Sequence, residues 1–221
     1  MRTLIQILAD NRRPNSLAVR MRRKRFLLFE NFIADLKEPI TILDVGGTVL
    51  FWDQMRFTNK HNIRLTLLNK TREITHRKNF VTIQGDARKM DRFADLSFDV
   101  AFSNSVIEHL ETWEAQLAMA REMQRVAKRI FLQTPNYYFP VEPHFLFPFF
   151  QFFPLGLKTW MLQNIKLGWY GRIPDKQRAR ELCSEIRLLS RKELKMLFPG
   201  CRIITERFLG LPKSFIVMCS A

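Results

Sequence analysis

The stretch TILDVGG, residues 41–47, predicts a short buried strand that ends near Asp44 and continues into Gly46 and Gly47. Short apolar runs bounded by glycine are typical of strands buried in a parallel sheet. The glycines let backbone N–H groups approach a ligand closely, because a Cβ would block that approach or forbid the required dihedral angles. The stretch therefore predicts a strand followed by a ligand-binding turn.

The same alternation continues along the chain. Further strands are predicted at residues 65–68, 80–83, 98–103 and 129–133. Helical stretches are predicted between them, the clearest at residues 111–128. Strands that alternate with helices at this spacing indicate a doubly wound, parallel α/β sheet. Two later strand patterns, at 201–207 and 214–219, predict a hairpin that closes one edge of that sheet.

The 221 residues have the length of one α/β domain, so we interpret 1–221 as a single domain. Its regions are an N-terminal helical region (1–38), a core of alternating elements (41–136), an aromatic insert (137–180) and closing strands (200–219).

The chain is strongly basic, with 36 Lys and Arg against 21 Asp and Glu and a formal net charge of +15. The excess lies in the flanks: eight basic residues against one acid in 1–29, and ten against five in 172–207. Such charge suits an anionic membrane or a nucleic acid, whereas a solvated helix face is the alternative interpretation.

The aromatic insert is rich in phenylalanine, since seven of the 20 Phe lie between residues 139 and 153. One interpretation is a packed cap over the core. The others are a hydrophobic acceptor pocket, a membrane-interface patch, or a stacking surface for single-stranded nucleic acid.

The cysteines Cys183, Cys201 and Cys219 are odd in number and far apart. They predict no disulfide framework and no metal site, and they favour a reducing cytoplasm. No run of ~20 apolar residues predicts a membrane span. We therefore expect a cytoplasmic protein, with peripheral membrane contact as an open alternative.

Polar residues follow the later strands as well. Asn69 follows the second strand, Asp86 and Ala87 the third, and Ser103 and Asn104 end the fourth. Carboxyl ends of parallel strands form the ligand-binding edge of such sheets. An amide there suits ribose hydroxyls, and a carboxylate beside a free N–H suits an adenine edge. Four such strand ends are far more specific than any one of them.

In these motifs the chain resembles the class I S-adenosylmethionine-dependent methyltransferases, in particular the type-11-like group. The matching segments are ILDVGG (42–47), LLN (67–69), GDA (85–87), FDVAFSNSVIEHL (98–110) and RVAKRIFLQTPN (125–136). The resemblance implies a Rossmann-like methyltransferase fold with a seven-stranded, mostly parallel sheet, an N-terminal helix and the aromatic insert between strands five and six. It also implies S-adenosyl-L-methionine as the cofactor.

The resemblance assigns residues to that cofactor. They are Asp44, Gly46, Gly47 and Thr48 in the first turn, Asn69 at the ribose, Asp86 and Ala87 at the adenine, and Ser103 and Asn104 near the sulfonium. Two positions depart from the family pattern, because Thr48 replaces a glycine and Asn69 replaces an acid. These departures keep a non-catalytic relative open as an alternative.

Methyl transfer is an in-line displacement that aligns the acceptor with the methyl group and removes a proton from the acceptor. The candidate catalytic residues are His109, after the fourth strand, and the pair Glu142 and His144 in the insert. The alternatives are a core or capping histidine at 109, and a loop pair that satisfies backbone groups at 142 and 144.

The sequence thus predicts methyl transfer to a small-molecule or lipid-like acceptor, hydrophobic or anionic, in a pocket covered by the Phe-rich insert. An RNA or protein methyltransferase and a non-catalytic binding protein are the alternatives. The end of the fourth strand, SNSV, lacks the [DN]PP[YF] of adenine N-methyltransferases, and no Pro-Cys pair offers a pyrimidine nucleophile.

Overall fold

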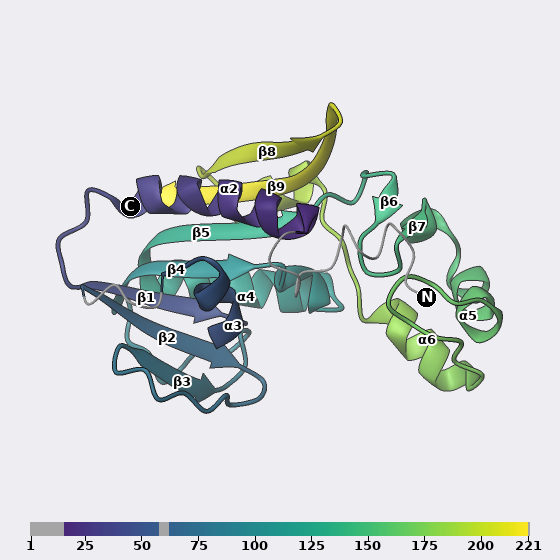
Figure 1. The fold of residues 1–221 in the computed structure, drawn as a ribbon, viewed down its shortest axis with the longest axis horizontal. Helices are drawn as coiled ribbons and strands as arrows, with labels where there is room; N and C mark the ends of the chain where they lie inside the picture. Colours follow the sequence, from purple (N-terminus) through teal and green to yellow (C-terminus); the bar gives the residue numbers. More distant parts are fainter. Residues whose placement is uncertain (1–15, 58–61, 221) are drawn as a thin grey trace.

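A seven-stranded sheet organises the chain, in the order β3-β2-β1-β4-β5-β9-β8 (Figure 1). The computed structural model describes residues 16–57 and 62–220, so part of the predicted helical region 1–38 lies outside the described residues. The strands are β1 (Ile40–Val45), β2 (Ile63–Asn69), β3 (Phe80–Gln84), β4 (Phe98–Asn104), β5 (Ala127–Pro135), β8 (Arg202–Phe208) and β9 (Leu211–Ser220). Neighbours among β1 to β5 pair in parallel, whereas β9 is antiparallel to both β5 and β8. The predicted mostly parallel sheet and its closing hairpin are confirmed.

Helices cover both faces of the sheet. The helices α2 (Leu17–Ile33) and α3 (Val49–Gln54) pack on one face, and α4 (Trp113–Val126) and α7 (Arg191–Leu197) on the other. Figure 1 shows α2 in front of the sheet and α4 behind it. Strand β1 contributes side chains to the hydrophobic clusters on both faces of the sheet. Ile42 faces the α2 side and Leu43 the α4 side, because successive side chains of a strand point to opposite faces.

Polar side chains fix where the helices begin. Ser16 and Thr112 accept from the N–H groups of Val19 and Ala115, and so cap α2 and α4. At α7, Ser190 and Glu193 form a capping box.

Two of the predicted crossover helices are absent from the structure. The described residues 70–79 and 85–97, which connect β2 to β3 and β3 to β4, contain turns and no helix. In 70–79 half of the residues are charged and Ile74 is the single aliphatic side chain, so a helix there would have no face to bury. Residues 85–97 pack Met90 and Phe93 against the core from turns instead of a helix.

The insert after β5 forms a small unit of its own. It contains the two-stranded pair β6 (Val141–Glu142) and β7 (Phe147–Pro148), the short η2 (Phe150–Phe152), α5 (Leu155–Asn164) and α6 (Lys176–Ser184). Its buried cluster is built around Phe145, Phe150 and Leu162, none of which belongs to the two clusters of the sheet. The insert extends beyond the carboxyl ends of the central strands (Figure 1).

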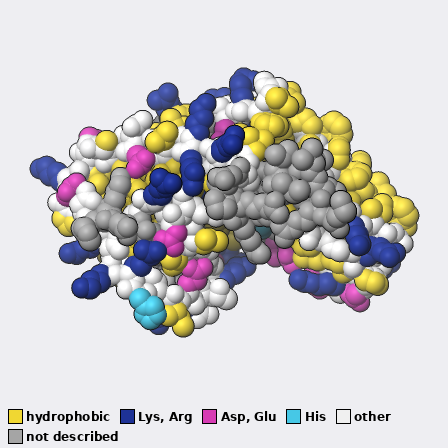
Figure 2. All heavy atoms as spheres, in the orientation of Figure 1, with side chains coloured by type: hydrophobic (Ala, Val, Ile, Leu, Met, Phe, Trp, Pro, Cys, Tyr) yellow, Lys and Arg dark blue, Asp and Glu magenta, His cyan; other side chains and the backbone are white. Residues whose placement is uncertain are grey.

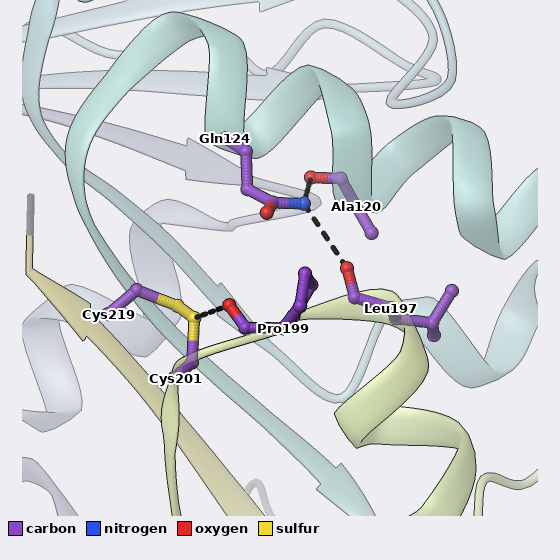
Figure 3. The surroundings of a disulfide bond; sticks show 6 residues. All are labelled: Ala120, Gln124, Leu197, Pro199, Cys201 and Cys219. Atoms are coloured by element: carbon purple, nitrogen blue, oxygen red, sulfur yellow. Dashed lines mark hydrogen bonds between the residues drawn. A yellow bond between two sulfur atoms is a disulfide. The ribbon is translucent and has the colours of Figure 1, made fainter.

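The prediction that the cysteines form no disulfide is wrong. Cys201, just before β8, is bonded to Cys219 of β9, with Cα atoms 4.7 Å apart (Figure 3). Antiparallel pairing of β8 with β9 brings together two residues that are 18 positions apart. Cys183 is the free, buried cysteine of the described residues. This bond weakens the argument from cysteine usage to a reducing compartment.

Within the described residues, the longest and most apolar helices still fall short of what a bilayer crossing requires.

Candidate functional site

The turn after β1 depends on its two glycines. Gly46 has φ +83°, and a Cβ there would lie 2.5 Å from Cγ2 of Val106. A Cβ on Gly47 would lie 1.8 Å from Oδ2 of Asp44. Both distances are far shorter than real Cβ contacts, so a side chain at either position would have to displace Val106 or Asp44, and Gly46 also has a φ that other residues rarely adopt.

Asp44 is buried at the base of this turn. The indole N–H of Trp52, on α3, donates to Asp44 Oδ2 at 2.7 Å. Burial raises the pKa of Asp44 to about 7, although the bond from Trp52 lowers it, and the carboxylate of Glu73 raises it further. Asp44 is therefore a carboxyl group that changes its charge near neutral pH.

Two side chains, one at the start of α3 and one at the end of β2, hold the turn in place. Thr48 caps α3 by accepting from the N–H of Phe51, which gives a structural reason for threonine where the family pattern has glycine. Asn69, at the end of β2, donates from Nδ2 to the carbonyl oxygens of Gly47 at 3.1 Å and Gly46 at 3.4 Å. Its amide thus clamps the turn.

The end of β3 presents a paired carboxylate and a free amide. Asp86 accepts from the N–H of Arg88 and forms an ion pair with its guanidinium at 2.6 Å. The hydrogen bond from Arg88 lowers the pKa of Asp86. The N–H of Ala87 donates to no acceptor among the described residues.

Hydrogen bonds join the side chains at the end of β4 to β1 and to α2. Ser103 is buried and donates to the carbonyl oxygen of Val45 at 3.0 Å. Asn104 Oδ1 accepts from Arg25, whose guanidinium also pairs with Glu206 at 3.3 Å. Sequence reasoning treated Arg25 only as part of a basic cluster, because nothing in its neighbourhood along the chain indicates these distant partners.

These residues fit S-adenosylmethionine in their chemistry. Within the described part of the chain, the N–H groups of Gly47, Thr48 and Ala87 are unused at the carboxyl ends of β1 and β3. Asp44 supplies a carboxyl group beneath the first turn, which suits a ligand with positive charge. Asp44 with the glycine turn would hold the methionine part, and Asp86 with Ala87 the adenine. The individual roles remain predictions.

A cavity of about 420 Å³ opens beside the ends of β4 and β5. Ser105, which directly follows β4, and Gln133 of β5 contribute to its wall. Its cationic residues are Arg22, Arg25 and Lys213. The other lining residues are mostly apolar: Leu17, Ala18, Met21, Pro135, Phe139, Val141, Pro143, Leu146, Trp169, Phe208 and the polar Ser214. We call this space the apolar cavity.

The three predicted catalytic residues come together in one cluster with a fourth residue. His144 and Glu142 share a hydrogen bond of 2.6 Å between Nδ1 and Oε1, and the rings of His109 and His144 lie 4.9 Å apart between centroids. The fourth member is Glu108, which sequence reasoning missed although it stands beside His109. Glu108 Oε2 accepts from Thr134 at 3.0 Å, and Oε1 is buried without a hydrogen-bond partner in the described structure.

The electrostatics of this cluster are unusual. Burial raises the pKa of Glu108 to about 7, against the influence of His144. Burial disfavours protonated His144, but the hydrogen bond and charge of Glu142 and the charge of Glu108 outweigh it and raise the pKa of His144. Partial burial and the neighbouring His144 lower the pKa of His109. Groups with pKa values moved in opposite directions are typical of functional sites.

An open α/β sheet with a glycine turn and polar residues at the carboxyl ends of β1, β2, β3 and β4 is the arrangement in which such sheets bind nucleotide-type ligands. Residues 43–130, which span these strand ends, match the family model of the methyltransferase domain. The chain thus has the class I methyltransferase fold, the class whose methyl donor is S-adenosylmethionine, as the sequence resemblance predicts.

Solved structures share this fold at low identity. A SAM-dependent methyltransferase from Aquifex aeolicus is 15% identical, with a TM-score of 0.54 and coverage of 98% of both chains. The N-terminal domain of EvdMO1, crystallised in the presence of SAH and D-fucose, is 17% identical, with a TM-score of 0.51 and coverage of 90% of this chain and 82% of that one. A possible exported protein from Bordetella parapertussis is 12% identical, with a TM-score of 0.57 and coverage of 96% and 71%. No protein among the curated ones matches the chain in sequence.

Proposed function

We propose that the protein transfers a methyl group from S-adenosylmethionine to an amphiphilic acceptor that has an apolar body and an anionic or hydroxyl head. The observation that carries this proposal is the apolar cavity. It begins at Ser105, one residue beyond the predicted sulfonium-facing end of β4, and it combines an apolar wall with Arg22, Arg25 and Lys213. A volume of about 420 Å³ suits a small organic molecule.

The cofactor supplies a methyl group on a positively charged sulfur. Held by Asp44 and the glycine turn, it would pass that methyl carbon to the acceptor oxygen by in-line displacement, and the electron pair of the broken carbon–sulfur bond would stay on sulfur. The acceptor proton leaves to the cluster of Glu108, His109, Glu142 and His144. None of these four side chains lines the apolar cavity in the described structure, but Pro143 and Leu146 of the same segment do, which supports an acceptor placed close to the cluster.

A membrane surface is the partner that the insert favours. Exposed apolar side chains gather there, including Phe149, Trp160 and Trp169, each about half exposed. Figure 2 shows hydrophobic side chains along the upper right of the molecule, over the region of β6, β7 and α5. Trp169 lies between the exposed Lys166 and Arg172 along the chain, a combination suited to anionic lipid. We propose that the protein takes its acceptor from such a surface.

The test compares a variant that fills the cavity with one that does not. Ala18 lines the apolar cavity, whereas Ala94 is exposed elsewhere. With radiolabelled S-adenosylmethionine and a panel of fatty acids, alkylphenols and anionic phospholipids, we expect label to enter the organic phase with the wild type and Ala94→Trp. Ala18→Trp should lose this transfer by roughly tenfold or more while cofactor affinity measured by calorimetry stays unchanged.

Equal transfer by both tryptophan variants would contradict the cavity as acceptor site. Absence of cofactor binding by the wild type would contradict the enzyme proposal itself. Label appearing in RNA, with an affinity that falls steeply with salt, would support the nucleic-acid alternative instead.

A further inference from the structure

The cluster at the end of η1 (Ile107–His109) has the composition of a metal site. Glu108, His109 and His144 each offer one ligand atom, and these atoms all lie within 4.8 Å of one another. Donor atoms on one zinc ion lie roughly 3–4 Å apart, so small side-chain rotations would close the triangle. We infer that these three residues bind one divalent metal ion.

The buried oxygen of Glu108 is the strongest single observation. Glu108 is 0% exposed, and its Oε1 has no hydrogen-bond partner among the described residues. A buried carboxylate oxygen without a partner is costly, and a bound cation removes that cost. Thr134 holds the other oxygen at 3.0 Å and thereby fixes which oxygen is left for the ion.

Glu142 acts as the outer partner that orients a ligand. Its carboxylate accepts from Nδ1 of His144 and from the backbone N–H groups of His144 and Phe145. With Nδ1 engaged, Nε2 is the nitrogen of His144 that remains for a ligand bond. A carboxylate behind a metal-binding histidine is the usual arrangement that sets its tautomer and increases its basicity.

The ligand set indicates which ion binds. Two imidazoles and one carboxylate suit borderline ions such as Zn²⁺, Fe²⁺ or Mn²⁺ better than Mg²⁺, which prefers an all-oxygen shell. Three protein ligands also leave a position open, as in catalytic zinc sites.

The open position suggests what the ion does. With the ion bound, its three ligands would no longer accept the acceptor proton themselves. The ion would instead supply positive charge to the acceptor oxygen and lower its pKa, so that solvent can take the proton. This role rests on the proposed function, whereas the binding of the ion does not.

The test titrates the metal-free, untagged full chain with Zn²⁺ by calorimetry and follows Co²⁺ by its visible absorption. We expect one ion per chain and a Co²⁺ spectrum of a four- or five-coordinate site. Glu108→Gln and His144→Asn should weaken Zn²⁺ binding by at least a hundredfold. Glu142→Gln should weaken it by about 10–100-fold while one site remains. His76→Asn, at an exposed histidine after β2, is the matched control and should bind as the wild type does.

A wild type that binds less than one tenth of an equivalent, or Glu108→Gln and His144→Asn variants that bind Zn²⁺ unchanged, would overturn the inference. If a variant does not fold, the Co²⁺ spectrum of the wild type tests the site by itself, and a spectrum without the bands of a four- or five-coordinate ion contradicts it. Cofactor titrations on the same samples separate the two proposals. Lost metal binding with intact cofactor binding contradicts only the metal site, and the reverse contradicts only the proposed function.

Discussion

The guanidinium of Arg25 donates to Asn104 Oδ1 at 2.6 Å and so ties helix α2 to the carboxyl end of β4. The same guanidinium is buried against Glu206 of β8. Burial opposes ionised Glu206, but Arg25 and Ser214 outweigh it and lower the pKa of that carboxyl group. One side chain of the basic N-terminal helix therefore joins that helix to two separate strands of the sheet, β4 and β8.

Replacement of Arg25 should destabilise the fold. In Arg25→Met the Glu206 carboxylate stays largely buried without its main cation, which we expect to lower the free energy of unfolding by about 3–5 kcal/mol. Urea denaturation measures this loss. The double variant Arg25→Met with Glu206→Gln should recover part of it, because no buried charge is left unpaired. A loss below about 1 kcal/mol in the single variant would mean that the pair is effectively solvated.

Gly47→Ala should abolish cofactor binding. The added Cβ would lie 1.8 Å from Asp44 Oδ2, so the first turn cannot keep its shape. Gly156→Ala is the matched control, because no atom lies within 4 Å of the added Cβ and the position is in α5. We expect calorimetry to show unchanged cofactor affinity for Gly156→Ala. Equal affinities for the two variants would show that the cofactor does not use this turn.

Asp44 should make the fold less stable as pH rises. Its usual pKa is 3.8, and in the folded chain it is about 7. The folded chain therefore keeps a proton that the unfolded chain loses between these values. The stability that this retained proton contributes is fully present below about pH 4. It is lost as the pH rises to about 7, at a rate of at most about 1.4 kcal/mol per pH unit.

Asp44→Asn tests this dependence, because the amide oxygen can still accept from Trp52. Urea denaturation across that pH window should give a shallower slope for the variant than for the wild type. Glu108, whose pKa is also raised, contributes a slope that both proteins share. Superimposable profiles would show that Asp44 titrates as an ordinary carboxylate.

The disulfide should stabilise the closing hairpin. Its loop closes a sequence separation of 18 residues, for which the chain-entropy estimate is about 3 kcal/mol. We expect Cys201→Ser with Cys219→Ser to lose about this much in oxidising buffer. In excess dithiothreitol the variant and the wild type should unfold alike. Two free thiols at these positions in protein purified without reductant would contradict the bond.

Membrane attachment through the insert should depend on its tryptophans. We expect the wild type to float with liposomes that contain phosphatidylglycerol, and Trp160→Ser with Trp169→Ser to stay in the soluble fraction. Ile74→Ser is the control, because Ile74 is also exposed but lies after β2, in the segment leading to β3. Equal flotation of all three proteins would contradict the proposal that the insert is the lipid-binding surface.

Patterns of neighbouring residues predicted the strands of the sheet well. They predicted poorly the contacts between residues that are distant in sequence. Strand ends such as Asp44 and Asn104 follow from short apolar runs closed by polar residues, and these depend only on neighbours in sequence. Glu108, by contrast, gains its role from His144 of the insert and Thr134 of β5. The bond between Cys201 and Cys219 depends in the same way on the register of β8 against β9. Such pairings are properties of the folded topology.

The crossover helices show the opposite error. Spacing alone predicted helices between β2 and β3 and between β3 and β4, although the first of these segments, 70–79, has no apolar stripe. A helix in a protein of this kind is stabilised mainly by the face that it buries. The absence of such a face in 70–79 was the available signal for that segment, whereas 85–97 buries Met90 without a helix and local sequence gave no warning of it.

The insert keeps its own buried cluster around Phe145, Phe150 and Leu162, and shares no member of it with the clusters on the two faces of the sheet. Mutations can therefore accumulate in one unit without loosening the other. Over generations, a lineage can repack the insert while the sheet keeps the packing of its two faces. Change in the insert and preservation of the sheet are, in this architecture, separately heritable.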